Sequence, residues 1–211
     1  EVKALGQLLK KPKRPFVAVI GGKKLTTKLP VIKTLLGVCD AVMVGGAMSH
    51  AVFVAQGYSI GASYLEKEGV AEARALLKTK KLLLPVDVIV AKNISDEATL
   101  EQVSVDEVKK GDVVVDVGPA TLKAWGEVIQ SAKTVLWNGP VGVTEIKKMG
   151  AGSRFLARVI GGHSQGAALG IAGGGDTIPV IMQTKTETWF DFVSTGGGAM
   201  LEFLVLKGRL P

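Results

Sequence analysis

The sequence predicts an α/β fold: a doubly wound, three-layer α/β/α arrangement around a mainly parallel, Rossmann-like sheet. Three observations support this prediction. Short, near-continuously apolar segments recur along the chain, and segments of helical pattern lie between them. Such apolar runs are typical of strands buried on both faces of a parallel sheet, and strands that alternate with helices form right-handed βαβ units. Glycines also follow directly after most of the apolar segments.

The elements follow in order along the chain. The apolar segments predict strands at Phe16–Ile20, Ala41–Val44, Val86–Ala91, Val113–Asp116, Thr134–Trp137, Ala168–Ala172 and Phe192–Thr195. Amphipathic patterns predict helices at Leu25–Leu36, Met48–Gln56, Lys67–Lys78, Ala120–Ser131, Ser153–Ile160 and Ala199–Val205. Residues 92–112 are polar and acidic-leaning, and we interpret them as a surface excursion between two strands of the sheet.

The domain organisation is simple. No Pro-, Gly- or Ser-rich linker divides residues 13–211, so they are expected to form one domain. Residues 1–12 contain a short amphipathic pattern that ends at Pro12, which we interpret as a connector helix to an upstream domain. No run approaches the roughly 18–20 apolar residues of a membrane span. The single cysteine, Cys39, and the lack of a signal-peptide pattern favour a reducing cytoplasm.

The formal net charge of +7 is unevenly distributed. Residues 1–33 hold nine Lys or Arg against one acid, Glu1. A basic field favours anionic ligands, which leaves nucleotide phosphates and nucleic acid as candidates. The three Trp, two Tyr and six Phe are not interleaved with the basic residues, which argues against a stacking platform for single-stranded nucleic acid.

Glycines gather where the predicted strands end. In open α/β sheets, ligands bind beyond the carboxyl ends of the strands, and backbone N–H groups at helix starts bind anions. Glycine also lets the backbone approach a ligand closely. Five strand ends at one edge therefore predict a phosphate site, formed by Gly21-Gly22, Gly45-Gly46, Asn138-Gly139-Pro140, Gly173-Gly174-Gly175 and Gly196-Gly197-Gly198.

Charged residues accompany two of these clusters. Lys24 and Lys28 are four residues apart, so a helix that begins near Lys24 would present both at the phosphate edge, where they could neutralise a phosphoryl group. Asp176 and Thr177 follow the glycines at 173–175, at the start of an expected helix. Asp176 either caps that helix or serves a magnesium ion, which takes oxygen ligands. We interpret Lys23 as a solvated lysine.

The sequence does not match the motifs of several other kinds of binding site. The glycine segments match neither the Walker A pattern nor the Gly-x-Gly-x-x-Gly fingerprint of dinucleotide enzymes. No Cys/His set has the spacing of a zinc site, and we interpret His50 and His163 as incidental.

Four segments together resemble the C-terminal domain of phosphoglycerate kinases, over essentially the whole chain. They are Arg14 through Lys28, Trp137 through Glu145, Gly173 through Thr177, and Ser194 through Ala199. Ala47 stands where the family usually has a third glycine, and Thr144 stands where it has an aromatic residue.

The resemblance implies roles for individual residues. Lys24 would stabilise the phosphoryl group in transfer, Lys28 would contact the nucleotide phosphates, and Asp176 would serve the magnesium that accompanies ADP or ATP. Thr177 would contact a phosphate, and Glu145 would bind the ribose hydroxyls. The remaining implied site residues line the transfer path (Gly174, Gly175 and Gly197), the nucleotide cleft (Asn138 and Pro140) and the adenine-side walls (Gly21, Gly22, Gly45 and Gly46).

The resemblance also implies a reaction, the reversible phosphoryl transfer between 1,3-bisphosphoglycerate and ADP that gives 3-phosphoglycerate and ATP. Family members hold the phosphoglycerate on an N-terminal domain, which a C-terminal tail rejoins and which closes by hinge-bending. Because this sequence supplies neither part, we expect an inactive, monomeric nucleotide-binding half. Two alternatives are a non-catalytic nucleotide-binding module and a basic nucleic-acid binder.

Overall fold

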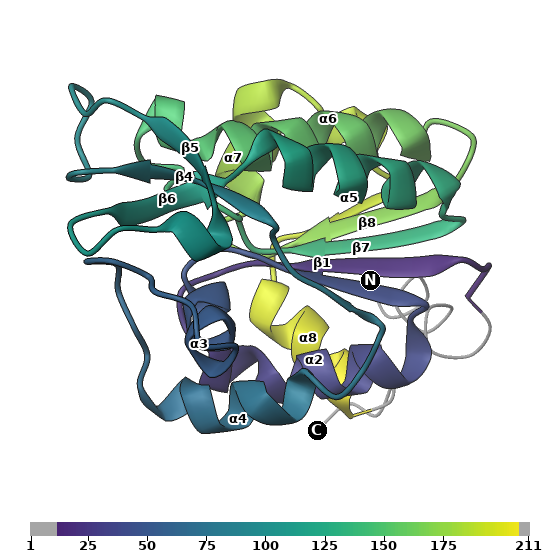
Figure 1. Cartoon of the computed structure of the whole chain (residues 1–211). Coiled ribbons are helices and arrows are strands. Elements are labelled where there is room, and N and C mark those ends of the chain that lie inside the picture. Colours follow the sequence, from purple (N-terminus) through teal and green to yellow (C-terminus); the bar gives the residue numbers. More distant parts are fainter. Residues whose placement is uncertain (1–11, 207–211) are drawn as a thin grey trace.

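The central feature of the computed structural model, which describes residues 12–206, is a sheet of six parallel strands between two layers of helices (Figure 1). The strand order is β3-β2-β1-β7-β8-β9. The bounds are β1 (Phe16–Ile20), β2 (Ala41–Val44), β3 (Leu82–Leu83), β7 (Thr134–Asn138), β8 (Leu169–Gly173) and β9 (Phe192–Ser194). The predicted connector helix at 1–12 lies almost wholly outside the described residues.

Helices cover both faces of this sheet, which confirms the predicted α/β/α class. One face packs against α2 (Leu25–Val38), α3 (Met48–Ala55), α4 (Glu68–Leu76) and α8 (Gly197–Val205). The other packs against α5 (Pro119–Ser131), α6 (Ala151–Ser164) and α7 (Ile178–Thr184). β1 feeds both layers, because Phe16, Ala18 and Ile20 belong to the first core and Val17 and Val19 to the second.

Two predicted strands do not belong to the parallel sheet. Val86–Ala91 and Val113–Asp116 correspond to β4 (Asp87–Ala91) and β6 (Val113–Val117), which pair antiparallel in a separate sheet of order β5-β4-β6. The third strand, β5 (Glu101–Ser104), lies in the segment interpreted as a surface excursion. The apolar pattern wrongly placed β4 in the parallel sheet because β4 is also covered on both sides. Val88 and Val90 face α3, whereas Ala91 packs beside Met149.

The remaining differences are small. The predicted helices begin and end within four residues of the observed bounds, and the largest difference is at the end of α6. The two-residue β3 and the seven-residue α7 were not assigned as elements, although a helix start near Asp176 was expected. Short 3-10 helices lie at Val105–Glu107, Lys147–Gly150 and Glu187–Trp189. None of the helices in residues 12–206 has the length and apolar character needed to cross a membrane.

The strand order creates a crevice. From β1 the chain winds outward to β2 and β3, and it later returns to β7 on the other side of β1. Ligands of open α/β sheets bind at such a reversal, beyond the carboxyl ends of the two strands. Here those ends carry Gly21 and Asn138, and the Gly21 amide donates to the Asn138 carbonyl at 2.9 Å.

Candidate functional site

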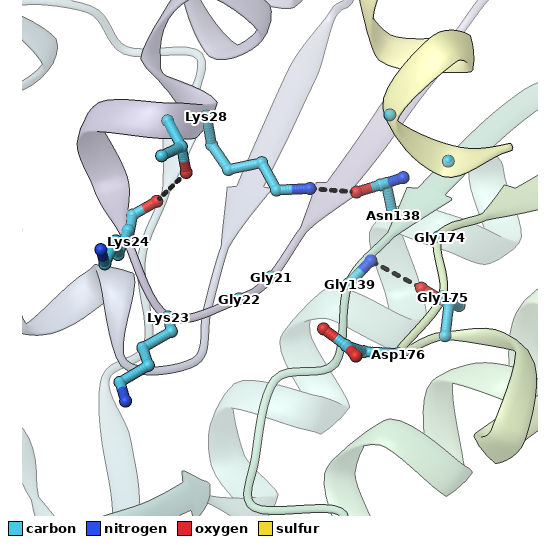
Figure 2. A pocket seen from close by; sticks show the side chains of 14 residues that line it. Gly21, Gly22, Lys23, Lys24, Lys28, Asn138, Gly139, Gly174, Gly175 and Asp176 are labelled. Atoms are coloured by element: carbon cyan, nitrogen blue, oxygen red, sulfur yellow. Dashed lines mark hydrogen bonds between the residues drawn. The ribbon is translucent and has the colours of Figure 1, made fainter.

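The first of two adjoining cavities lies at this reversal, where the loops after β1, β7 and β8 meet the start of α8 (Figure 2). Its volume is about 330 Å³. Its lining is rich in glycine and lysine and consists of Gly21, Gly22, Lys23, Lys24, Thr27, Lys28, Asn138, Gly139, Gly174, Gly175, Asp176, Thr177, Gly197 and Gly198.

Close contact between the backbones of the loops explains why several of these positions are glycine. A Cβ on Gly197 would lie 2.1 Å from the Gly174 Cα, and a Cβ on Gly139 would lie 2.1 Å from the Gly21 carbonyl oxygen. Gly174 also has a φ of +113°, and Gly139 has a φ of +91°, which only glycine adopts without strain. On the side of these glycines the cavity wall is therefore polypeptide backbone, with no side chain to cover it.

Four of the amides at this edge are open to an anion. The N–H groups of Gly175 and Asp176, before α7, and of Gly197 and Gly198, at the start of α8, have no acceptor within residues 12–206. The start of α2 differs, because Glu66 accepts the Leu25 amide at 2.5 Å and the Thr26 amide at 3.1 Å. The helix start with amides open to an anion is thus that of α8, together with the loop before α7.

Lys28 is the central cation of the first cavity. It extends from α2 across the cavity and donates to Oδ1 of Asn138 (Figure 2). Burial lowers the pKa of Lys28, and the nearby Asp176 carboxylate opposes that shift. Asn138 is 1% exposed, and its Nδ2 has no acceptor within the described part of the chain. A buried donor without a partner is costly, so an anionic oxygen in the cavity would satisfy it.

Glu66 fixes the start of α2 and therefore the position of the lysines. Lys24 is the N-cap of α2 but makes no side-chain cap hydrogen bond. Glu66, which is 8% exposed, takes over this function from the loop before α4, and it also accepts the Thr26 hydroxyl at 2.5 Å. Burial alone would raise the pKa of Glu66, but the bonds from Thr26 and Leu25 and the charge of Lys24 lower it overall.

Asp176 and Thr177 have different surroundings. The N-cap of α7 is Thr177, so the observed helix does not use Asp176 as its cap. The exposed Asp176 carboxylate instead lines both cavities. The fully buried Thr177 hydroxyl accepts the Gly139 amide at 2.7 Å and donates to the Gly173 carbonyl at 2.9 Å, so it ties the two loops together.

The second cavity is larger, about 850 Å³, and extends from the first between the two sheets and α7. It shares Gly22, Lys23 and Asp176 with the first cavity. Its remaining walls are mostly apolar, with a few polar groups; they include Gly46, Ala47, His50, Tyr64, Ile94, Val115, Pro140, Val141, Val143, Thr144, Glu145 and Val180. An apolar slot beside a cavity lined by glycines and lysines suits a heteroaromatic base with a sugar.

Asp116, at the end of β6, supports the loop that borders this slot. Its carboxylate accepts the Gly152 amide at 2.7 Å and the Val117 amide at 2.9 Å. A Cβ on Gly142 would lie 2.3 Å from its Oδ1, so the loop rests directly on the carboxylate. Burial raises the pKa of Asp116 to about 7, although these amides and Arg154 oppose the shift.

The structure brings together nearly all the predicted site residues. Lys24, Lys28 and the glycines at 21, 22, 174, 175 and 197 line the first cavity, together with Asn138, Asp176 and Thr177. Gly46, Pro140 and Glu145 line the second. Gly45 lines neither, because it lies behind the slot, where a Cβ would be 2.9 Å from Val141.

Sequence reasoning missed some lining residues. Lys23 is exposed, in agreement with its interpretation as a solvated lysine, but it also lines both cavities. His50, interpreted as incidental, lines the second cavity. His50 is 3% exposed, and its Nδ1 lies 2.8 Å from the Tyr64 carbonyl oxygen. The position of Lys23 directly after Gly22 was the available signal. Nothing in the local sequence marks His50 or Tyr64, because their contact links residues in different segments.

Comparison with known proteins gives a consistent result. The family model of phosphoglycerate kinase matches residues 1–207. Phosphoglycerate kinases of Herpetosiphon aurantiacus and Desulfosudis oleivorans are 43% and 38% identical over 209 residues, which is 97% of this chain and 52% of each relative. The chain thus spans about half the length of these curated relatives.

Solved structures agree with the sequence relatives. Phosphoglycerate kinase from Coxiella burnetii matches with a TM-score of 0.91 at 39% identity, covering 97% of this chain and 53% of that one. Phosphoglycerate kinase from Pyrococcus horikoshii matches with a TM-score of 0.82 at 25% identity, covering 98% of this chain and 54% of that one.

Proposed function

The chain belongs to the phosphoglycerate kinase family, and from that premise we propose that it is the nucleotide-binding half of an enzyme that transfers a phosphoryl group between 1,3-bisphosphoglycerate and ADP. One observation supports this most strongly. A glycine-lined cavity with lysines and free amides opens directly into an apolar slot, and the two share Gly22, Lys23 and Asp176. A nucleoside diphosphate fits this pair, with its base in the slot and its phosphates at the glycines.

The proposed reaction needs positioning and charge stabilisation rather than a covalent enzyme intermediate. An oxygen of the ADP terminal phosphate attacks the phosphorus of the acyl phosphate, and the bond to the carboxylate oxygen of 3-phosphoglycerate breaks. Lys28 and the amides of Gly197 and Gly198 hold the nucleotide phosphates, while Lys24 stabilises the charge on the transferred group. Domain closure would exclude water.

Other residues complete the binding site. Glu145 accepts the ribose hydroxyls, and Pro140 and Gly46 border the base. A magnesium ion would supply charge that neutralises the phosphates, and Asp176 would hold it. The donor set fits, because Mg²⁺ is usually bound by one or two carboxylates together with substrate phosphates. A cytoplasmic location and a monomeric state are part of the same proposal.

Titration calorimetry with ADP, with and without Mg²⁺, tests the proposal. We expect ADP to bind and Mg²⁺ to strengthen the binding, whereas a nucleic-acid binder would be indifferent to Mg²⁺. No heat at millimolar ADP would overturn the nucleotide site. We also propose that ATP formation from 1,3-bisphosphoglycerate requires the other half of the enzyme. Robust turnover by this chain alone would contradict that division.

The role of Lys24 separates an enzyme from a non-catalytic module. In a protein that joins this chain to the amino-terminal half of a relative, Lys24→Ala should reduce kcat far more than ADP affinity. Lys28→Ala should reduce both. An equal loss of kcat and affinity in Lys24→Ala would make Lys24 a binding residue only.

A further inference from the structure

Lys23 occupies the junction of the two cavities. It follows Gly22, which has a φ of +137°, and precedes the N-cap of α2. Together with Gly22 and Asp176 it lines both cavities. A ligand with its base in the larger cavity and its terminal phosphate in the smaller one must pass this junction, and the group found there in a nucleotide is the phosphate attached to the nucleoside.

The three lysines of the first cavity have different partners. Lys28 donates to Asn138, and the charge of Lys24 acts on Glu66. The Lys23 ammonium instead lies 4.9 Å from the centre of the Tyr64 ring, and no oxygen acceptor for it is found in the described part of the chain. Figure 2 shows its side chain directed away from that of Lys28.

This contact leaves the Lys23 ammonium available to a ligand. A ring face attracts a cation but accepts none of its three N–H groups as a phosphate oxygen does. Tyr64 is 41% exposed and itself lines the larger cavity, so the ammonium rests at the cavity rim rather than away from it. Lysine is a compact charge on a flexible stem, so it can move from the ring to an anion nearby.

We propose that Lys23 is a specificity-determining residue that binds the nucleoside-linked phosphate and so makes the site discriminate nucleotides from nucleosides, while Tyr64 holds the ammonium when no phosphate is bound. This deepens the proposed nucleotide-binding function and rests on it. Asp176 across the junction is the only other charged residue that lines both cavities, so Lys23 is the cation best placed for this phosphate.

Titration calorimetry with adenosine, AMP and ADP tests the proposal on the wild type, Lys23→Gln and Lys110→Gln. Lys110 is exposed and lines neither cavity, so its variant controls for the loss of one charge. We expect Lys23→Gln to weaken AMP and ADP binding about three- to tenfold and to leave adenosine binding unchanged. Lys110→Gln should change none of the three.

Three results would overturn the inference. One is unchanged AMP and ADP affinity in Lys23→Gln. A second is an equal loss for adenosine and AMP, which would mean that the substitution merely disturbed the slot. An AMP loss of the same size in Lys110→Gln would also refute it, since only long-range charge would then be involved. If the wild type binds neither AMP nor ADP, the proposed function itself fails.

Discussion

A pair of adjacent glycines in α8 offers a sharp test of the proposed phosphate site in the first cavity. A Cβ on Gly197 would lie 2.1 Å from the Gly174 Cα and 2.4 Å from its nitrogen, whereas a Cβ on Gly198 would meet nothing within 4 Å. Gly197→Ala must therefore push the start of α8 and the loop before α7 apart by more than 1 Å to reach ordinary contact. Gly198→Ala requires no movement.

The expected energies follow from that difference. Overpacking of this kind costs about 1–3 kcal/mol, whereas replacing a helical glycine by alanine gains at most about 1 kcal/mol. Gly197→Ala should therefore lower the free energy of unfolding by about 1–2 kcal/mol, and Gly198→Ala should raise it slightly. Urea titration measures both. Because the amides at 175 and 197 would separate, Gly197→Ala should also weaken ADP binding at least tenfold, by calorimetry. Equal stability and equal ADP affinity in the two variants would refute the reasoning.

Three further predictions concern carboxylates. Burial raises the pKa of Asp116 to about 7 from an ordinary 3.8, so the stability that this group contributes is lost as the pH rises through 7. In urea titrations, the free energy of unfolding should fall by about 2 kcal/mol from pH 5.5 to 8. If the free energy of unfolding of Asp116→Asn falls just as much over this pH range, the prediction is wrong. Glu66→Ala should lower the free energy of unfolding by about 1–2 kcal/mol, because the amides at 25 and 26 lose their acceptor, and Glu66→Gln should lower it less. Equal decreases in the two variants, measured by urea titration, would disprove the capping role. Asp176→Asn should raise the Mg²⁺ concentration needed for tight ADP binding and leave the unfolding midpoint unchanged, whereas an unaltered Mg²⁺ requirement in calorimetry would exclude it as a metal ligand.

The meeting of the glycine clusters could be predicted from the sequence for a physical reason. Strand ends of a parallel sheet gather at one edge, so glycines after five apolar segments had to approach one another. The register of β1 and β7, which aligns Ile20 with Asn138, then brings two of these clusters into backbone contact. These features depend on residue type and order, which the sequence contains directly.

Other features depend on contacts between distant segments. Glu66 caps α2 from 41 residues away, and Gly152 in α6 donates to Asp116 in β6. Such pairs cannot be predicted from the residues adjacent to each partner in the sequence. The antiparallel sheet was missed because a strand covered on both sides shows the same apolar run whichever way its neighbours point. Lys23 is exposed, as the sequence predicts, but its position beside both cavities depends on segments that only the folded chain brings together.

The most direct test of the central claim is a nuclear magnetic resonance titration of this chain with Mg²⁺ and ADP that follows backbone amides. If the glycine edge binds the phosphates, the amides of Gly175, Asp176, Gly197 and Gly198 should shift most, and those of Val115 and Val141 should respond to the base. Amides along the exposed strand β5 should stay still. Shifts confined to β5 and the lysines at 109 and 110, or no shifts with millimolar ADP, would contradict the claim.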